Sequence, residues 1–71
     1  MSKLFSSREI VAILLRDGFL FISQKGSHAK YRKTGDVVAT VIVPTGKKEI
    51  PIGTLHSIIR QSRLPNKKFS K

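Results

Sequence analysis

The sequence predicts an α+β fold in which three antiparallel strands form a sheet and two helices cover one of its faces. Apolar residues at helical spacing occur in one stretch near each end of the chain. Between them lie three short stretches with strand patterning, separated by turn residues. Short connections make neighbouring strands antiparallel, because parallel strands need a long crossover. Two helices cover a single face of so small a sheet, so the other face is expected to be open.

The first helix is expected over residues 7–17. Ser6 and Glu9 have the spacing of a capping box, in which each side chain accepts a hydrogen bond from the backbone N–H of the other residue. Gly18 offers the left-handed conformation that commonly ends a helix. The apolar stripe expected to face the sheet consists of Ile10, Val11, Leu14 and Leu15.

The three strands are expected at residues 19–22, 28–33 and 37–43. Residues 34–36 are typical of a hairpin turn, and Pro44 ends the third strand because proline cannot donate a ladder hydrogen bond. The first and third strands look apolar on both sides, so the open face should carry exposed apolar side chains. Such a patch is either a partner surface or is covered by strand edges and the tail of the chain.

The second helix is expected to begin near Pro51, with Thr54 or Gly53 as its cap, and to end near Leu64. A proline follows Leu64 and cannot continue a helix. The apolar stripe of this helix consists of Leu55, Ile58 and Ile59, with Ile52 as a further candidate.

The length and composition leave room for one small domain. A chain of 71 residues buries only a thin core. Residues 1–64 are expected to form the domain and residues 65–71 a mobile basic tail, unless Phe69 docks back. The longest apolar run, Ile10 to Leu15, is far shorter than the roughly 20 residues of a membrane-spanning helix, so a cytoplasmic protein without a membrane partner is expected. Two histidines, four acidic residues and no cysteine argue against a metal site, and no cofactor is expected.

The charge distribution favours a polyanionic partner. The net charge is +10, and residues 25–71 hold eleven basic side chains against two acidic ones, compared with three against two in residues 1–24. Such a field attracts nucleic acid and speeds its capture. The alternative is a basic surface kept for solubility, and for so small a domain we favour nucleic acid.

The second strand places a histidine beside two cations. Its apolar members, Ala29 and Tyr31, should face the helices. The opposite face then carries His28, Lys30 and Arg32, spaced about 6.5 Å apart. Metal-independent RNA cleavage needs a base for the 2′-hydroxyl proton, an acid for the leaving oxygen, and positive charge for the transition state. His28 can supply one proton transfer, with Tyr31, Lys30 or a substrate-bound water as its partner. On residue types alone, a solvated histidine is the commoner case.

Other basic residues offer further contacts. Lys25 precedes the turn before His28 and adds positive charge there. Lys47 and Lys48 come just before the second helix, where they either hold a phosphate together with the helix dipole or form a charged connector. Their surroundings lack the G-x-x-x-x-G-K-[ST] spacing, so a nucleoside-triphosphate site is rejected. His56 forms a basic stripe with Arg60 and Arg63 on the second helix, for which a solvated face is the favoured interpretation over a nucleic-acid contact.

Three stretches carry a family resemblance: "DGF" at residues 17–19, "KGSHAKY" at residues 25–31 and "KEIPIGTLHSIIRQSRL" at residues 48–64. With them the chain resembles HicA, the small toxin of HicAB-type toxin–antitoxin systems, from about residue 6 to residue 64. The resemblance implies a fold like that of a double-stranded-RNA-binding domain. It also implies ribonuclease action on mRNA and a HicB antitoxin that covers the active region.

The catalytic histidine of this family corresponds to His28, which Gly26 and Ser27 precede. The residues expected to contact RNA are Lys25, Ser27, Lys30, Arg32, Lys47 and Lys48. For Lys30, Arg32, Lys47 and Lys48 the expectation rests on charge and placement alone.

Three positions depart from the family pattern. His56 stands where members often have arginine, residues 61–63 replace "QAG" with "QSR", and residues 45–46 replace a loop histidine that is common elsewhere. The leading hypothesis is a metal-independent endoribonuclease in which His28 is the general acid or base. The alternatives are a non-catalytic RNA-binding module of the same fold and an interaction protein that uses the open apolar face.

Overall fold

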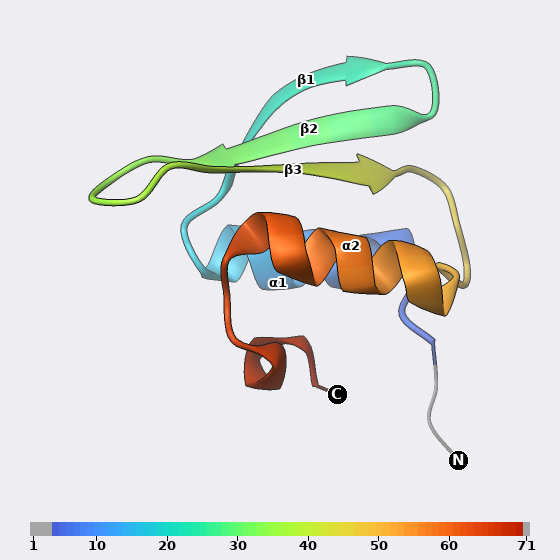
Figure 1. Cartoon of the computed structure of the whole chain (residues 1–71). Helices are drawn as coiled ribbons and strands as arrows, with labels where there is room; N and C mark the ends of the chain where they lie inside the picture. The colour runs from blue at the N-terminus through green and yellow to red at the C-terminus, as the bar shows by residue number, and fades with distance from the viewer. Residues whose placement is uncertain (1–3, 71) are drawn as a thin grey trace.

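The structure is a computed structural model that describes residues 4–70. It confirms the α+β fold and the predicted element order (Figure 1). The elements are α1 (Ser7–Arg16), β1 (Leu20–Lys25), β2 (His28–Lys33), β3 (Ala39–Pro44), α2 (Ile52–Ser62) and a short 3-10 helix, η1 (Asn66–Phe69). The strands form one antiparallel sheet in the order β1-β2-β3. This is the arrangement of a double-stranded-RNA-binding-domain-like fold.

The helix ends follow local capping chemistry. The capping box is confirmed, since Glu9 N–H donates to Ser6 Oγ at 3.1 Å and Ser6 N–H donates to the Glu9 carboxylate at 2.8 Å. Gly18 has φ 96, as its predicted role in ending α1 requires. The expectation that Thr54 or Gly53 caps α2 was wrong, because both residues lie inside the helix and its N-cap is Pro51, which makes no side-chain capping bond.

Several strand boundaries differ from the prediction. β1 starts one residue later than expected and runs on to Lys25, because Phe19 turns into the core and is fully buried. β3 starts at Ala39, so Val37 and Val38 lie exposed in a loop longer than the predicted turn.

The core lies between the helices and the strands β2 and β3. Its fully buried side chains are Ile10, Leu14, Phe19, Val41, Val43, Ile50 and Ile58. Leu15 was expected in this set but is half exposed, while Ile13 packs against the core in its place. Ile52 is also exposed, so the apolar stripe of α2 begins at Leu55.

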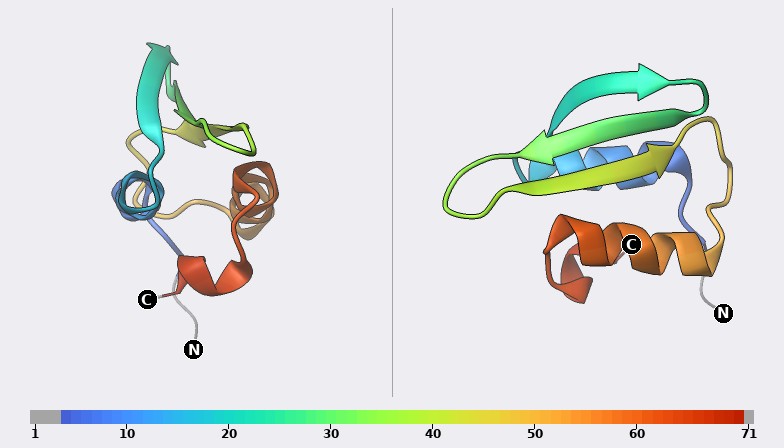
Figure 2. Two further views of the ribbon diagram at one scale, coloured as in Figure 1. Left: turned by 90° about the vertical axis from the view of Figure 1, so that its left-hand side faces the viewer. Right: turned by 45° about the horizontal axis from the view of Figure 1, so that its top comes forward.

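The two helices lie side by side under the sheet and leave its other face open (Figure 2). All six residues of β1 are exposed, because this strand extends beyond the helices. The exposed apolar side chains expected on the open sheet are present, among them Leu20 at 67% and Ile42 at 37% exposure. The tail does not cover them, because η1 lies on the far side of the helices (Figure 1).

The tail was predicted to be mobile unless Phe69 docks back. Phe69 does dock, at 6% exposure, as part of the hydrophobic core. The boundary of the domain at residue 64 and the mobility of the tail stay predictions, with Phe69 as the contact that links the tail to the domain.

Candidate functional site

Three segments distant in sequence meet at one end of the sheet, on the right of Figure 1. They are the β1–β2 turn, the C-terminal end of β3 with the loop that follows it, and the first turn of α2. The backbone N–H of Thr45 donates to the carbonyl of Ser27 at 2.8 Å, which ties the loop after β3 to the β1–β2 turn. Residues of the "KGSHAKY" stretch and of the stretch at residues 48–64 therefore lie in one site.

His28 is held by a tight turn. Gly26 and Ser27 are the only residues between the paired Lys25 and His28, and Gly26 has φ 59. Positive φ at the first central residue alone is the requirement of a type II′ turn, which explains the glycine. The His28 side chain is exposed and lies on the open face of the sheet, as strand alternation predicts.

An open groove of about 520 Å³ begins at His28 and runs along the outer edge of β3 beside α2. We call it the His28 groove. Its polar lining includes His28, Lys47, Thr54, Ser57 and Gln61, and its apolar lining includes Ile42, Pro44 and Ile58. The groove therefore offers a titratable side chain, a cation and several hydrogen-bonding groups against an apolar wall.

The structure brings some of the predicted cations to His28 and leaves others apart. Lys25 pairs directly with His28, Lys30 lies two residues along the same face, and Lys47 lines the groove. Arg32 lies farther along β2, where its Nε donates to Thr40 Oγ1 at 3.1 Å. Lys48 lines a different cavity, beside the N-terminus of α1.

The structure also bears on the roles predicted for Ser27 and Tyr31. The Ser27 carbonyl is engaged by Thr45, so Ser27 serves the turn whether or not its side chain meets a ligand. Tyr31 is 8% exposed on the face that packs toward the helices, and Phe21 contacts its ring edge-on at a centroid distance of 5.7 Å. Tyr31 lies on the wrong side of the sheet to share a substrate with His28, so its candidacy as proton-transfer partner was wrong.

Ser7 was missed by sequence reasoning. Its Oγ donates to the Pro44 carbonyl at 2.6 Å and accepts from the Lys47 N–H at 3.0 Å, while its own N–H donates to the Lys47 carbonyl at 2.9 Å. Ser7 is 7% exposed, so these bonds are shielded from water. They attach the loop that carries Lys47 to the first turn of α1, and no local sequence pattern indicates a contact between residues 40 positions apart.

Gln61 was also missed, although its spacing gave a signal. Thr54, Ser57 and Gln61 follow the i, i+3, i+7 pattern of one helical face. That face lies along the edge of β3, where Gln61 Oε1 accepts the Ile42 N–H at 3.0 Å. Gln61 thus accepts a hydrogen bond from a backbone N–H on the outer edge of β3, where no further strand of the described chain pairs.

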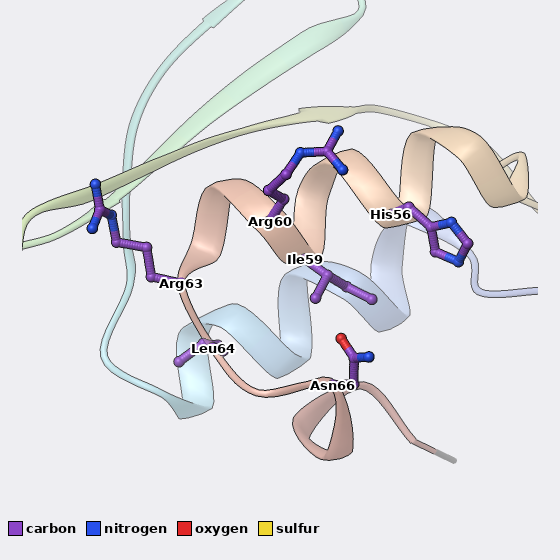
Figure 3. A pocket seen from close by; sticks show the side chains of 6 residues that line it. All are labelled: His56, Ile59, Arg60, Arg63, Leu64 and Asn66. Carbon is purple, nitrogen blue, oxygen red and sulfur yellow. The ribbon is translucent and has the colours of Figure 1, made fainter.

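His56 lies on a second, separate basic surface (Figure 3). This His56 surface comprises His56, Arg60 and Arg63 around an open depression of about 520 Å³ that Ile59, Leu64 and Asn66 also line. The three basic side chains point in different directions (Figure 3). Arg60 Nη2 donates to Ser57 at 3.2 Å, and Arg63 lies beyond the end of α2. The predicted continuous stripe is therefore interrupted, and the surface has the diverging geometry of a solvated helix face.

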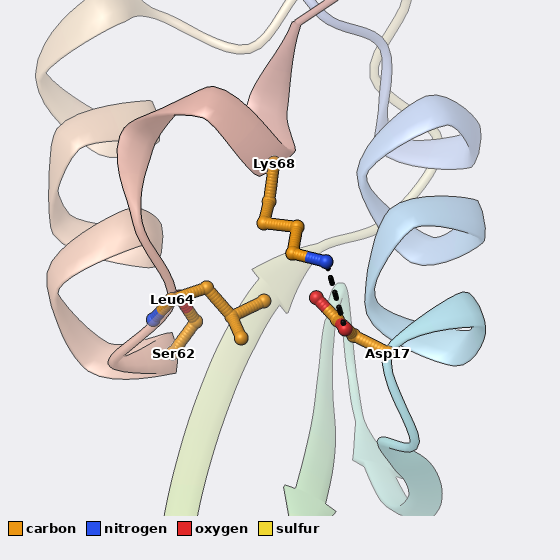
Figure 4. Close-up of polar contacts among 4 residues, drawn as sticks. All are labelled: Asp17, Ser62, Leu64 and Lys68. Carbon is orange, nitrogen blue, oxygen red and sulfur yellow. Dashed lines mark hydrogen bonds and ion pairs between the residues drawn. The ribbon is translucent and has the colours of Figure 1, made fainter.

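An ion pair anchors the tail at the opposite end of the molecule. Lys68 Nζ lies 3.7 Å from Asp17 Oδ1, between the C-terminal ends of α1 and α2 (Figure 4). The nearby Ser62 Oγ donates to the Ile59 carbonyl at 2.7 Å and accepts the Leu64 N–H at 3.1 Å. These contacts close the helix ends and lie away from the His28 groove.

Two further findings concern residues 4–70. No group of three or more His, Cys, Asp or Glu side chains lies close enough to hold a metal ion within this range. In the same described part of the chain, neither helix has the length and apolar character needed to cross a bilayer.

Comparison with known proteins supplies the family. Residues 7–64 match the family model described as the HicA toxin of bacterial toxin–antitoxin systems. The match includes every strand, both α-helices and the whole His28 groove. A search of curated proteins found no match. The chain belongs to the HicA toxin family and is therefore the toxin of a toxin–antitoxin system with a cognate antitoxin as its partner.

Proposed function

We propose that the protein is an endoribonuclease that cleaves mRNA without a metal ion and uses His28 as general acid or base. The observation that carries the proposal is the position of His28, which is exposed at the mouth of a groove and flanked by cations from two elements. Lys47 lines the groove, and Lys25 and Lys30 lie beside His28 on the open face of the sheet, so a polyanion bound across His28 is near positive charge from both the sheet and the loop. Membership of a toxin family supports a destructive activity at such a site.

The reaction would proceed by transesterification within the RNA. The 2′-oxygen forms a bond to the neighbouring phosphorus as a base removes its proton, and the bond from phosphorus to the 5′-oxygen breaks as an acid supplies a proton to that oxygen. His28 performs one of these transfers. Lys30 or a substrate-bound water remains as its partner, and the ammonium groups stabilise charge on the phosphoryl oxygens.

The antitoxin is proposed to be a HicB-type protein that covers the His28 groove. A protein that blocks this groove excludes RNA, which is the simplest way to silence such a toxin. Ile42 lines the groove and is exposed, and across β2 the exposed Leu20 of β1 lies on the same open face, so the partner gains apolar contact area there.

The test is cleavage of purified mRNA in the presence of a chelator. Wild-type protein should yield fragments, whereas folded His28→Ala should yield about 10²- to 10⁴-fold less. Circular dichroism checks that the variant is folded, and growth after induction reports toxicity in cells. Equal cleavage by the two proteins would remove His28 from the mechanism.

A non-catalytic RNA-binding module is the second candidate, because the net charge of +10 supports affinity without turnover. Such a module would retain RNA with an affinity that falls steeply with salt, yet produce no fragments. Incubation of end-labelled RNA with the purified protein separates the two functions.

A further inference from the structure

We propose that the His28 groove reads one base of the bound RNA through the side-chain amide of Gln61, and that it favours bases with a carbonyl at the read position over bases with an amino group. This inference rests on RNA as the ligand of the groove. It assigns a specificity-determining residue on the α2 side of the groove, whereas the phosphate-binding cations come from the sheet and from the loop after β3.

The orientation of the Gln61 amide follows from its backbone partner. The Ile42 N–H is a donor and Gln61 Oε1 accepts it at 3.0 Å. An amide in the opposite orientation would place an NH₂ donor against an N–H donor, so the contact determines which end of the amide faces the strand. The NH₂ group, with two donors, is the end left for a ligand.

The other polar groups along the same face of α2 do not discriminate. Thr54 and Ser57 line the groove beside Gln61. Ser57 Oγ accepts from Arg60 Nη2 at 3.2 Å, yet each hydroxyl keeps a rotatable O–H and a lone pair and can therefore donate or accept. The exposed Ile42 and the half-buried Pro44 contribute apolar surface against which a flat base can lie. Gln61 is therefore the member of this face whose hydrogen-bonding character is determined in advance.

The spacing between His28 and the Gln61 amide suits a phosphate and a neighbouring base of one RNA strand. His28 pairs with Pro44, and Ile42 lies two residues farther along β3. Diagonal neighbours of this kind lie roughly 7–8 Å apart. A phosphate at His28 thus leaves a neighbouring base within reach of the Gln61 amide, which Ile42 holds in place.

The chemistry of the bases gives the direction of the preference. Uracil and guanine present carbonyl oxygens, O4 and O6, where cytosine and adenine present amino groups. The NH₂ group of Gln61 donates a hydrogen bond to a carbonyl oxygen, whereas it meets a second donor in an amino group. Uracil and cytosine form the best matched pair, because they have the same size and differ in this group.

The experiment compares binding of fluorescent 2′-O-methyl oligouridine and oligocytidine, which lack the 2′-hydroxyl nucleophile and stay intact. Wild-type protein should bind oligouridine about five- to tenfold more tightly. Gln61→Glu keeps an acceptor for the Ile42 N–H but offers an acceptor to the base, so the ratio should invert. Gln61→Met should bring the ratio close to one. The new charge of Gln61→Glu changes the affinity for both oligonucleotides alike, so it does not affect the ratio of the two affinities.

Equal ratios in the wild-type protein and both variants would overturn base reading by Gln61. Cleavage of unmodified RNA, measured in parallel with the same proteins, addresses the proposed function by itself. If RNA is cleaved but the variants do not change the affinity ratio, the nuclease function stands and base reading by Gln61 is overturned. If the variants change the ratio but no RNA is cleaved, the result supports base reading by a binding module.

Discussion

The His28 groove and the His56 surface each combine one histidine with basic side chains, yet they differ in how these side chains are held. Around His28 the groups come from the β1–β2 turn, the loop after β3 and α2, and a backbone hydrogen bond connects the turn to the loop. Around His56 the basic groups come from one helix and its end, and they diverge. Convergence of groups from different elements is what allows several of them to contact one substrate.

The largest expected difference between the two regions is in activity. We expect His28→Ala to lower RNA cleavage by about 10²- to 10⁴-fold and His56→Ala to change it by less than about twofold. The reason is that only His28 lies in the groove with converging cations. Rates of cleavage of one labelled RNA by both variants provide the measurement. A loss for His56→Ala as large as that for His28→Ala would contradict the comparison.

The two buried serines give the next test. Ser7→Ala leaves the Pro44 carbonyl and the Lys47 N–H without their hydroxyl partner, and Ser62→Ala does the same to Ile59 and Leu64. Each change should lower the free energy of unfolding by about 1–3 kcal/mol, as measured by urea denaturation.

Activity should separate these serines. Ser7→Ala removes two of the three hydrogen bonds by which Ser7 holds the loop carrying Lys47, and it should lower kcat about tenfold under conditions where the protein is folded. Ser62→Ala should leave kcat unchanged, since Ser62 closes the far end of α2. Ser7→Thr retains a hydroxyl and serves as the conservative control. Equal kcat values for the two alanine variants would show that Ser7 acts on stability alone.

A glycine substitution in the turn that holds His28, compared with one in α2, tests whether the turn requires glycine. The position of a Cβ at Gly26 is open, so Gly26→Ala meets no neighbour but must adopt φ 59. That strain should lower the free energy of unfolding by about 1–2 kcal/mol and reduce cleavage. Gly53→Ala is the control, because it lies in α2 with open space around its Cβ, and it should raise stability by about 0.4–1 kcal/mol. Thermal denaturation of both variants should therefore show opposite shifts.

The smallest effect is expected on the His56 side. Arg63 ends α2 with φ 61, a conformation that favours glycine. We expect Arg63→Gly to raise the free energy of unfolding by about 0.5–1 kcal/mol, since relief of left-handed strain exceeds the entropy cost of glycine. Cleavage should not change if the His56 surface is only solvated. A lower affinity for RNA in this variant would instead indicate that Arg63 contacts the substrate.

Local patterns predicted the elements and part of the site. The capping box at Ser6, the strand alternation that exposes His28, and the element order are all confirmed. Each depends on residues two to four positions apart, which a single element brings together. The exposure of Leu15 was not predictable in this way, because periodicity defines a stripe but the position of the sheet decides which edge of the stripe is covered.

The sequence by itself determined the order of helices and strands, the open sheet face and the placement of His28 on it. Only the tertiary structure decided which residues share the groove with His28. The contacts from Thr45 to Ser27, from Ser7 to Lys47 and from Gln61 to Ile42 join segments 18, 40 and 19 positions apart. Such contacts form when separate elements pack against a common core, and no spacing within one element encodes them.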